Sequence, residues 1–243
     1  MKVSFPDWRA LVAEFLGTFV FVFVACGSVL TRNIFEDFGV VGVALATGVI
    51  MAALVFATVA ISGGHLNPAI TLATWLTKQI DTTTALLYVA AQVIAGFAAA
   101  FLLLFVFGDK GMAFYLGGPI LATDATVQSA LIVEAILTAV LVFVFFATMV
   151  EKQSLQSSSS QDSTAGLKRG PVSFGPLAIG LVFLAGGIFA GPMDGAALNP
   201  VKVAPLIVSG HTESLLVWVV GPLAGALFGL VYEFLFLRQS KKK

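Results

Sequence analysis

The chain has 243 residues, of which 58% are hydrophobic and 11% charged, with a formal net charge of zero and a mean hydropathy of +1.00. So few charged residues cannot cover the surface of a soluble domain of this size. The composition therefore predicts a membrane protein and excludes a soluble one. The balanced charge, without a basic patch, argues against a nucleic-acid partner. Cys26 is the single cysteine, which excludes an intrachain disulfide and a cysteine metal cluster.

Six stretches with few charges are long enough to cross a membrane, because a hydrocarbon core of about 30 Å needs roughly 20 helical residues. These stretches lie between Arg9 and Arg32, Asp37 and His65, Asp81 and Asp109, Asp124 and Glu151, Arg169 and Asp194, and Glu213 and Arg238. Their length and their Leu, Ala, Val and Phe content favour helices over the short alternating strands of a membrane barrel. We therefore predict an all-α membrane protein with six transmembrane helices.

The second half of the chain repeats features of the first half. The matched pairs are Glu14 with Glu134, Thr18 with Thr138, Asn67 with Asn199, Pro68 with Pro200, and Gly96 with Gly225. Three spans in each half make the two halves enter the membrane from opposite sides, which is an inverted repeat. The prediction is one transmembrane domain over residues 1–243, built from repeats at about 1–118 and 119–243.

Each Asn-Pro pair begins a stretch that is too short to cross the membrane. Asparagine is a favoured N-cap and proline is favoured at the first helical position, so both pairs predict a helix start. About ten helical residues cover half of the hydrocarbon core, which predicts two re-entrant half-helices that meet at the midplane. The non-helical approaches, residues 62–65 and 194–197, would lie at membrane depth, where backbone is tolerated inside protein or along a watery cavity. A polar pore is the simplest structure that meets this condition.

The distribution of Lys and Arg predicts the orientation. Ten of the thirteen basic residues lie at the termini or in the connections after the second and fourth spans, and Arg32, Lys110 and Lys202 lie on the other face. By the positive-inside rule, both termini are expected to be cytoplasmic. Residues 152–170, which include a serine-rich run, are then a cytoplasmic linker, with a phosphorylation site as the alternative function of the serines.

These features resemble the aquaporin and aquaglyceroporin superfamily, the major intrinsic proteins, over nearly the whole chain. The two Asn-Pro-Ala boxes of that family are similar to residues 67–69 and 199–201, the second with Val201 in place of alanine. Supporting similarities are Ala13-Glu14-Phe15, Ser62-Gly63-Gly64-His65, Gln92, and Trp218-Val219-Val220-Gly221-Pro222.

The resemblance implies a passive channel for water and small neutral solutes, such as glycerol, urea or ammonia, that excludes protons and ions. It implies that the pore midplane is formed by Asn67, Pro68, Ala69, Asn199, Pro200 and Val201. It implies that backbone carbonyls line the approaches at Gly63, Gly64, His65, Gly195 and Ala197. Two half-helix N-termini, each with about half a positive charge, would repel cations and orient passing water. The family resemblance also implies a homotetramer with one pore per subunit, in contact with membrane lipid, and no cofactor.

The family's constriction corresponds to Thr47, Gly187, Ala196 and Lys202 in this chain. Water-selective members are similar to one another in having an aromatic residue, a histidine and an arginine there, and this chain departs from that pattern. Three small side chains predict a wider mouth than a filter for single water molecules. Lysine keeps the positive charge but lacks the five-donor fork of arginine, so we expect looser positioning of solutes. Glycerol-conducting members have an aspartate after that arginine, where this chain has Val203.

Glu14 and Glu134 lie in apolar spans, where an ionisable group is costly and usually faces the bundle interior. The resemblance implies that they brace the two re-entrant loops, and the competing interpretation is the proton relay of a transporter. We interpret His65 as a hydrogen-bonded loop residue rather than a metal ligand, because His211 is the only other histidine and no carboxylates are suitably spaced.

Three functional hypotheses remain at this point. The first is a passive channel, the second is an ion-coupled secondary transporter of a small solute, and the third is a structural or adhesion protein with a closed pore. An enzyme is disfavoured, because no nucleophile, base and orienting group form a set, and no metal site is expected.

Overall fold

The computed structural model describes residues 6–35, 39–150 and 174–237, so the predicted linker at 152–170 lies outside the described residues. Within these ranges, six helices are long and apolar enough to cross a membrane, which confirms the predicted spans. They are α1 (Trp8–Phe35), α2 (Gly39–Ser62), α4 (Thr82–Ala113), α5 (Val127–Phe145) with η2 (Phe146–Val150), α7 (Gly175–Asp194), and α9 (Leu215–Ala226) with α10 (Phe228–Tyr232) and η4 (Glu233–Leu237). A short turn, η1 (Tyr115–Gly117), follows α4.

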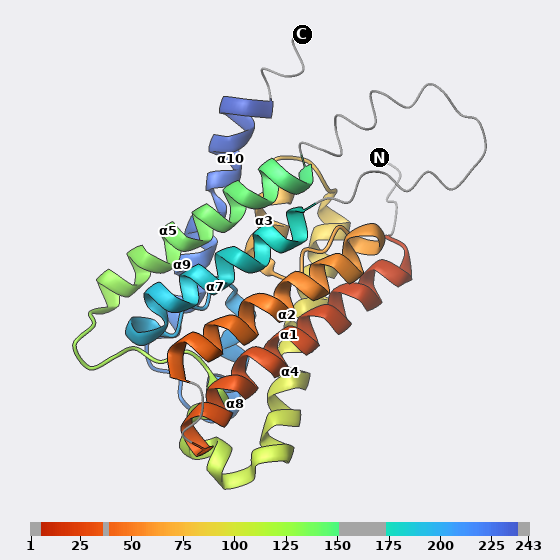
Figure 1. Cartoon of the computed structure of the whole chain (residues 1–243). Coiled ribbons are helices and arrows are strands. Elements are labelled where there is room, and N and C mark those ends of the chain that lie inside the picture. Colours follow the sequence, from red (N-terminus) through yellow and green to blue (C-terminus); the bar gives the residue numbers. More distant parts are fainter. Residues whose placement is uncertain (1–5, 36–38, 151–173, 238–243) are drawn as a thin grey trace.

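Two short helices follow the Asn-Pro pairs, as predicted. The first is α3 (Pro68–Leu76), and the second consists of η3 (Pro200–Val203) and α8 (Ala204–Val208). Figure 1 shows α3 and α8 near opposite ends of the bundle of long helices. The second short helix begins with a tighter 3₁₀ turn, because Pro205 has no N–H to donate and the Val201 carbonyl accepts from the Ala204 N–H instead.

The outer surface of the bundle is apolar, whereas polar residues lie inside it. Large exposed side chains include Phe101, Phe105, Ile132, Phe189 and Phe234. The buried polar side chains, by contrast, include Glu14, Thr18, Gln92, Glu134 and Thr138. This distribution is the reverse of that in a soluble domain, and it fits a helix bundle whose surroundings are lipid.

The two halves of the bundle pack in the same way. Helix α1 packs against α2 and α4, and α5 packs against the corresponding helices α7 and α9. The most extensive contact joins the halves, where α2 crosses α7. At this crossing a Cβ on Gly48 would lie 2.6 Å from the Gly180 carbonyl oxygen, so the backbones approach closely. Gly48 and Gly180 are 132 positions apart, the same spacing as Asn67 and Asn199, so the crossing lies at the axis of the inverted repeat.

Candidate functional site

The two non-helical approaches have the same backbone conformation. Each approach has left-handed backbone angles at three positions, which are Gly63, Gly64 and Leu66 in the first and Gly195, Ala196 and Leu198 in the second. Both sets lie at the same positions relative to the following asparagine. Ala196, at φ 44°, has the conformation that glycine provides in the first approach, and such angles are uncommon for residues with a Cβ. Long-range contacts must therefore hold these segments.

Glu14 supplies such contacts to the first approach. Its carboxylate accepts hydrogen bonds from the backbone N–H of His65 at 3.0 Å and of Leu66 at 2.7 Å. It also accepts from the Ser62 hydroxyl at 2.6 Å and from the Gln92 side-chain amide at 2.8 Å. The carboxylate is completely buried, and these four donors, three from residues 62–66 and one from α4, satisfy it.

Glu134 makes the equivalent contacts with the second approach. Its carboxylate accepts from the backbone N–H of Ala197 at 2.5 Å and of Leu198 at 2.8 Å. Asp194 adds a further contact, since its Oδ1 accepts from the Ala196 N–H at 2.8 Å. The glutamates predicted to brace the two loops thus each bond the two backbone N–H groups that precede an asparagine.

Asn67 and Asn199 connect the two short helices to each other. The Asn67 side-chain amide donates to the Leu198 carbonyl at 2.8 Å, and the Asn199 amide donates to the Leu66 carbonyl at 2.9 Å. Each asparagine also caps its own helix, because its Oδ1 accepts from the N–H of Ala69 at 2.8 Å or of Val201 at 3.2 Å. The two helix N-termini therefore meet, joined by a reciprocal pair of hydrogen bonds.

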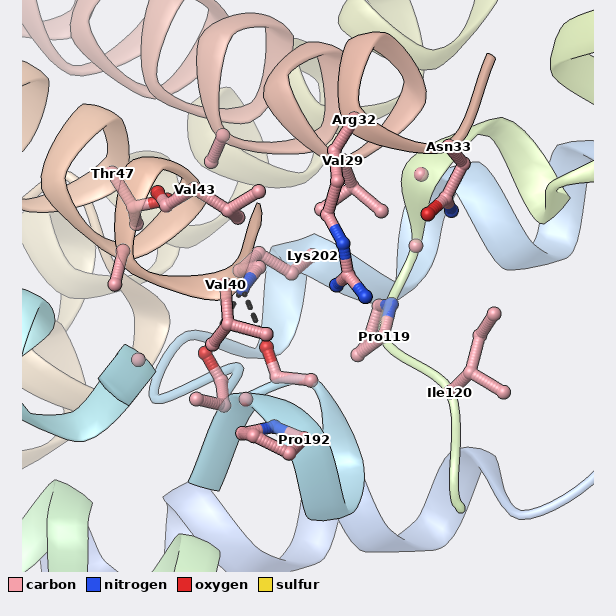
Figure 2. Close-up of a pocket in the computed structure, with 18 of the residues that line it drawn as sticks. Val29, Arg32, Asn33, Val40, Val43, Thr47, Pro119, Ile120, Pro192 and Lys202 are labelled. Atoms are coloured by element: carbon pink, nitrogen blue, oxygen red, sulfur yellow. Dashed lines mark hydrogen bonds between the residues drawn. The ribbon is translucent and has the colours of Figure 1, made fainter. Parts of the chain in front are cut away.

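The four residues of the predicted filter come together at one cavity, which we call the Lys202 cavity. It has a volume of about 300 Å³, and Thr47, Gly187, Ala196 and Lys202 are all among its lining residues. Figure 2 shows Lys202 with its two hydrogen bonds in this cavity. The ammonium donates to the carbonyls of Gly195 at 3.2 Å and Ala196 at 2.9 Å. Lys202 thus bonds carbonyl groups of the second approach, whereas Glu134 bonds N–H groups of the same segment.

A second cavity includes residues of the first approach, and we call it the His65 cavity. Its volume is about 560 Å³, and Gly63 and His65 are among its lining residues. The His65 ring lies 3.1 Å from the Thr71 hydroxyl and packs edge-on against Tyr88 and Phe145. The first approach thus borders the His65 cavity, and the second borders the Lys202 cavity. Asn67 follows the first approach in the chain, and Asn199 follows the second.

The other residues of the two boxes have apolar surroundings. Pro68, Pro200 and Val201 line a third cavity together with apolar side chains of α4 and α9. Ala69 is completely buried in the hydrophobic core. In the boxes, it is therefore the asparagines that provide polar side chains, while the neighbouring residues pack the short helices against the bundle.

Sequence reasoning missed Asp194 and Arg32 as members of the site. Asp194 occupies the position that Ser62 has in the first half, at the 132-residue spacing, so extending the repeat to the helix ends could have identified it. Arg32 lines the Lys202 cavity from the end of α1. No sequence signal marks Arg32, because its position depends on how α1 packs. Among the described residues, no group of three or more His, Cys, Asp or Glu could hold a metal ion.

The chain is similar to known proteins both in sequence and in fold. The family model described as major intrinsic protein matches residues 1–232. The chain is 37% identical to Aquaporin TIP4-4 of Zea mays, covering 96% of this chain and 88% of the relative. It is 32% identical to Aquaporin Z of Photorhabdus laumondii, and the match covers 96% of this chain and 99% of that relative. The X-ray structure of the aquaglyceroporin from Plasmodium falciparum has a similar fold, with a TM-score of 0.76 over 97% of this chain and 99% of that one, at 20% identity. Together with the six-helix fold, these matches establish that the chain belongs to the major intrinsic protein family.

Proposed function

We propose that this protein is a passive channel for water and small neutral solutes, which move down their gradients while protons and ions are excluded. The observation that carries the proposal is the meeting of two half-helix N-termini, joined through Asn67 and Asn199, next to approaches that border two separate cavities. The relatives named aquaporins support the same function. Because the family consists of channels, the protein is not an enzyme.

The mechanism follows from the dipoles and donors at this meeting point. Each helix N-terminus contributes about half a positive charge, which opposes the passage of cations. Each asparagine amide has two N–H donors, one of which is used in the reciprocal bond, and the second can donate to the oxygen of a passing water molecule. A water molecule held by its oxygen between two donors cannot pass a proton along the file. The carbonyls of the approaches replace the contacts that a neutral solute loses on leaving bulk water.

A secondary transporter is less well supported, because the two buried glutamates are engaged by the approaches. Glu14 accepts four hydrogen bonds and Glu134 accepts two from the backbone, as expected for groups that hold the loops in place. A proton relay would need carboxylates that face a water-filled path.

As part of the proposal, residues 1–243 form one channel domain, with repeats at about 1–118 and 119–243.

The residues that line the Lys202 cavity support the passage of small neutral solutes as well as water. Thr47, Gly187 and Ala196 have small side chains, and the Thr47 hydroxyl is bonded to the Val43 carbonyl at 2.8 Å. We expect the double substitution Thr47→Phe and Gly187→His to lower the flux of glycerol or urea relative to water, because larger rings narrow the mouth. Unchanged flux ratios would contradict a wide filter formed by these positions.

The function can be tested by stopped-flow light scattering on reconstituted vesicles. We expect vesicles that contain the protein to shrink faster in a hyperosmotic buffer than empty vesicles do, without saturation. If neither water nor any small neutral solute were accelerated, the channel function would be wrong. Saturable uptake that depends on a proton gradient would instead support a transporter.

We also propose a homotetramer with one pore per subunit and both termini on the cytoplasmic side. Six membrane crossings bring the two ends of the chain to one side, and the lysine and arginine distribution favours the cytoplasm. Crosslinking of the protein in vesicles should reach four subunits. A crosslinking series that stops at monomers, or terminal tags accessible from outside intact cells, would contradict this arrangement.

A further inference from the structure

The Lys202 cavity contains a second basic side chain besides Lys202. Among its described lining residues, the charged ones are Arg32, from the end of α1, and Lys202. Figure 2 shows the Arg32 side chain extending from α1 into the cavity, with its guanidinium between Lys202 and Pro119. A cavity whose charged groups are of one sign attracts electron-rich groups and disfavours cations.

The two basic groups differ in how far the protein uses their donors. Two of the three ammonium donors of Lys202 have backbone acceptors, the carbonyls of Gly195 and Ala196. Arg32 is half-buried, and within the described part of the chain its guanidinium has no hydrogen bond or ion pair with another residue. Its five N–H donors are therefore available to molecules that enter the cavity.

The chemistry of these donors indicates which molecules would bind. A guanidinium is planar and always charged, and it presents a rigid fork that can donate two hydrogen bonds to one oxygen or to a pair of oxygens. The carbonyl of urea and the neighbouring hydroxyls of a polyol match this pattern. An ammonium that is already held by two carbonyls cannot offer such a fork.

We propose that Arg32 is a specificity-determining residue of this channel, whose guanidinium binds the oxygen atoms of urea or small polyols in the Lys202 cavity. Arg32 thus supplies, from α1, the forked donor that position 202 lacks. The side chain raises the local concentration of such solutes beside Thr47, Gly187 and Lys202 before they pass. This inference rests on the proposed channel function and extends it to solute choice.

The test compares the solute-to-water permeability ratio of four proteins in phosphatidylcholine vesicles. They are the wild type, Arg32→Gln, Arg32→Lys and Arg9→Gln. Stopped-flow light scattering gives the water permeability and the urea and glycerol permeabilities of the same vesicles, so the ratio does not depend on the amount of protein inserted or folded. Arg9 is a matched control, because it is an exposed arginine on the same helix that stacks on the neighbouring Trp8 ring.

We expect Arg32→Gln to lower the urea-to-water ratio by about tenfold or more, which is the scale of losing a hydrogen bond from a charged donor. Arg32→Lys should recover less than half of the wild-type ratio, because it restores the charge without the fork, and Arg9→Gln should match the wild type. An unchanged or higher ratio in Arg32→Gln would overturn the proposal, and so would full recovery in Arg32→Lys. A wild type that conducts neither water nor solutes would instead refute the channel function.

Discussion

Glu14 and Glu134 occupy matched positions in the two repeats, but their carboxylates accept different numbers of hydrogen bonds. Within the described ranges Glu14 accepts from two backbone N–H groups and two side chains, whereas Glu134 accepts from two backbone N–H groups. The difference arises because the Ser62 hydroxyl and the Gln92 amide both donate to Glu14. In the second half, Asp194 stands at the position of Ser62, and Gly221, which lies beside the Cβ of Glu134, has no side chain to donate. The first brace is thus the more extensively bonded one.

We predict that Glu14→Gln destabilises the protein more than Glu134→Gln. The introduced amide turns one acceptor into a donor, so about two buried donors lose their acceptor in the first case and one in the second. Each unsatisfied buried donor costs about 1–3 kcal/mol. Cys26 is buried and is the chain's single cysteine, so a thiol-reactive dye reports the melting temperature of the detergent-solubilised protein. A lower melting temperature for Glu134→Gln would show that the number of donors does not decide the effect.

We expect ion exclusion to weaken when Lys202 loses its positive charge. Replacing Lys202 with Met removes a positive charge from the cavity and the two bonds to the carbonyls of Gly195 and Ala196. We expect a measurable cation leak, because a fixed positive charge contributes to the barrier that cations meet. Potassium flux into vesicles that enclose a fluorescent indicator measures the leak, and Lys202→Arg, which keeps the charge, should stay tight. A tight Lys202→Met variant would show that the helix N-termini and Arg32 exclude cations without Lys202.

At the scale of the elements, the crossing of α2 and α7 depends on two glycines that face each other. A Cβ on Gly180 would come into close contact with the Gly48 carbonyl oxygen and would lie 2.6 Å from the Ala52 Cβ. Backbone cannot move away here without separating the two helices that join the repeats. The close approach therefore requires glycine, whatever the helix propensity of the alternatives.

We predict that Gly180→Ala lowers the melting temperature, because overpacking at such a contact costs about 1–3 kcal/mol. The matched control is Gly191→Ala on the same helix, where a Cβ would meet Val40 at an ordinary 3.6 Å. The control should leave the melting temperature unchanged or raise it slightly, since alanine is the better helix former. The Cys26 dye assay measures both variants, and equal effects would argue against the crossing as the cause.

At the scale of the whole molecule, the two repeats are joined at their centre by the hydrogen bonds of Asn67 and Asn199. Each amide donates to the residue that precedes the other asparagine, so each half fixes the position of the other. Neighbouring residues that share such contacts have non-additive effects on stability, whereas distant ones add.

We predict that the double variant Asn67→Ala and Asn199→Ala loses less thermal stability than the two single variants summed, because the first substitution already loosens the contact that the second removes. For comparison, Asn67→Ala should combine additively with Ser129→Ala, since Ser129 belongs to the exposed capping box at the start of α5. Melting temperatures of all five variants give the comparison. Additive losses for the two asparagines would mean that the half-helices are held independently.

The sequence determined the features that depend on local chemistry and on the membrane. Apolar stretches of about 20 residues predict the six spans, because hydrocarbon tolerates little else. Asparagine followed by proline predicts the starts of both short helices, since the cap and the missing N–H act within a few residues. The matched pairs Glu14 with Glu134 and Asn67 with Asn199 predict that the halves correspond. These features follow from short-range rules, so the fold class could be predicted from the sequence.

The tertiary structure decided which distant residues meet. Arg32 lines the same cavity as Thr47 and Lys202, although it lies on a different helix and no sequence pattern marks it. The left-handed backbone of Leu66 and Leu198 is unfavourable for leucine, and it is held because Glu14 and Glu134, on other helices, accept hydrogen bonds from the N–H groups of these two leucines. Contacts of this kind depend on how six helices pack around two short ones, and packing is a property of the whole bundle rather than of any one segment.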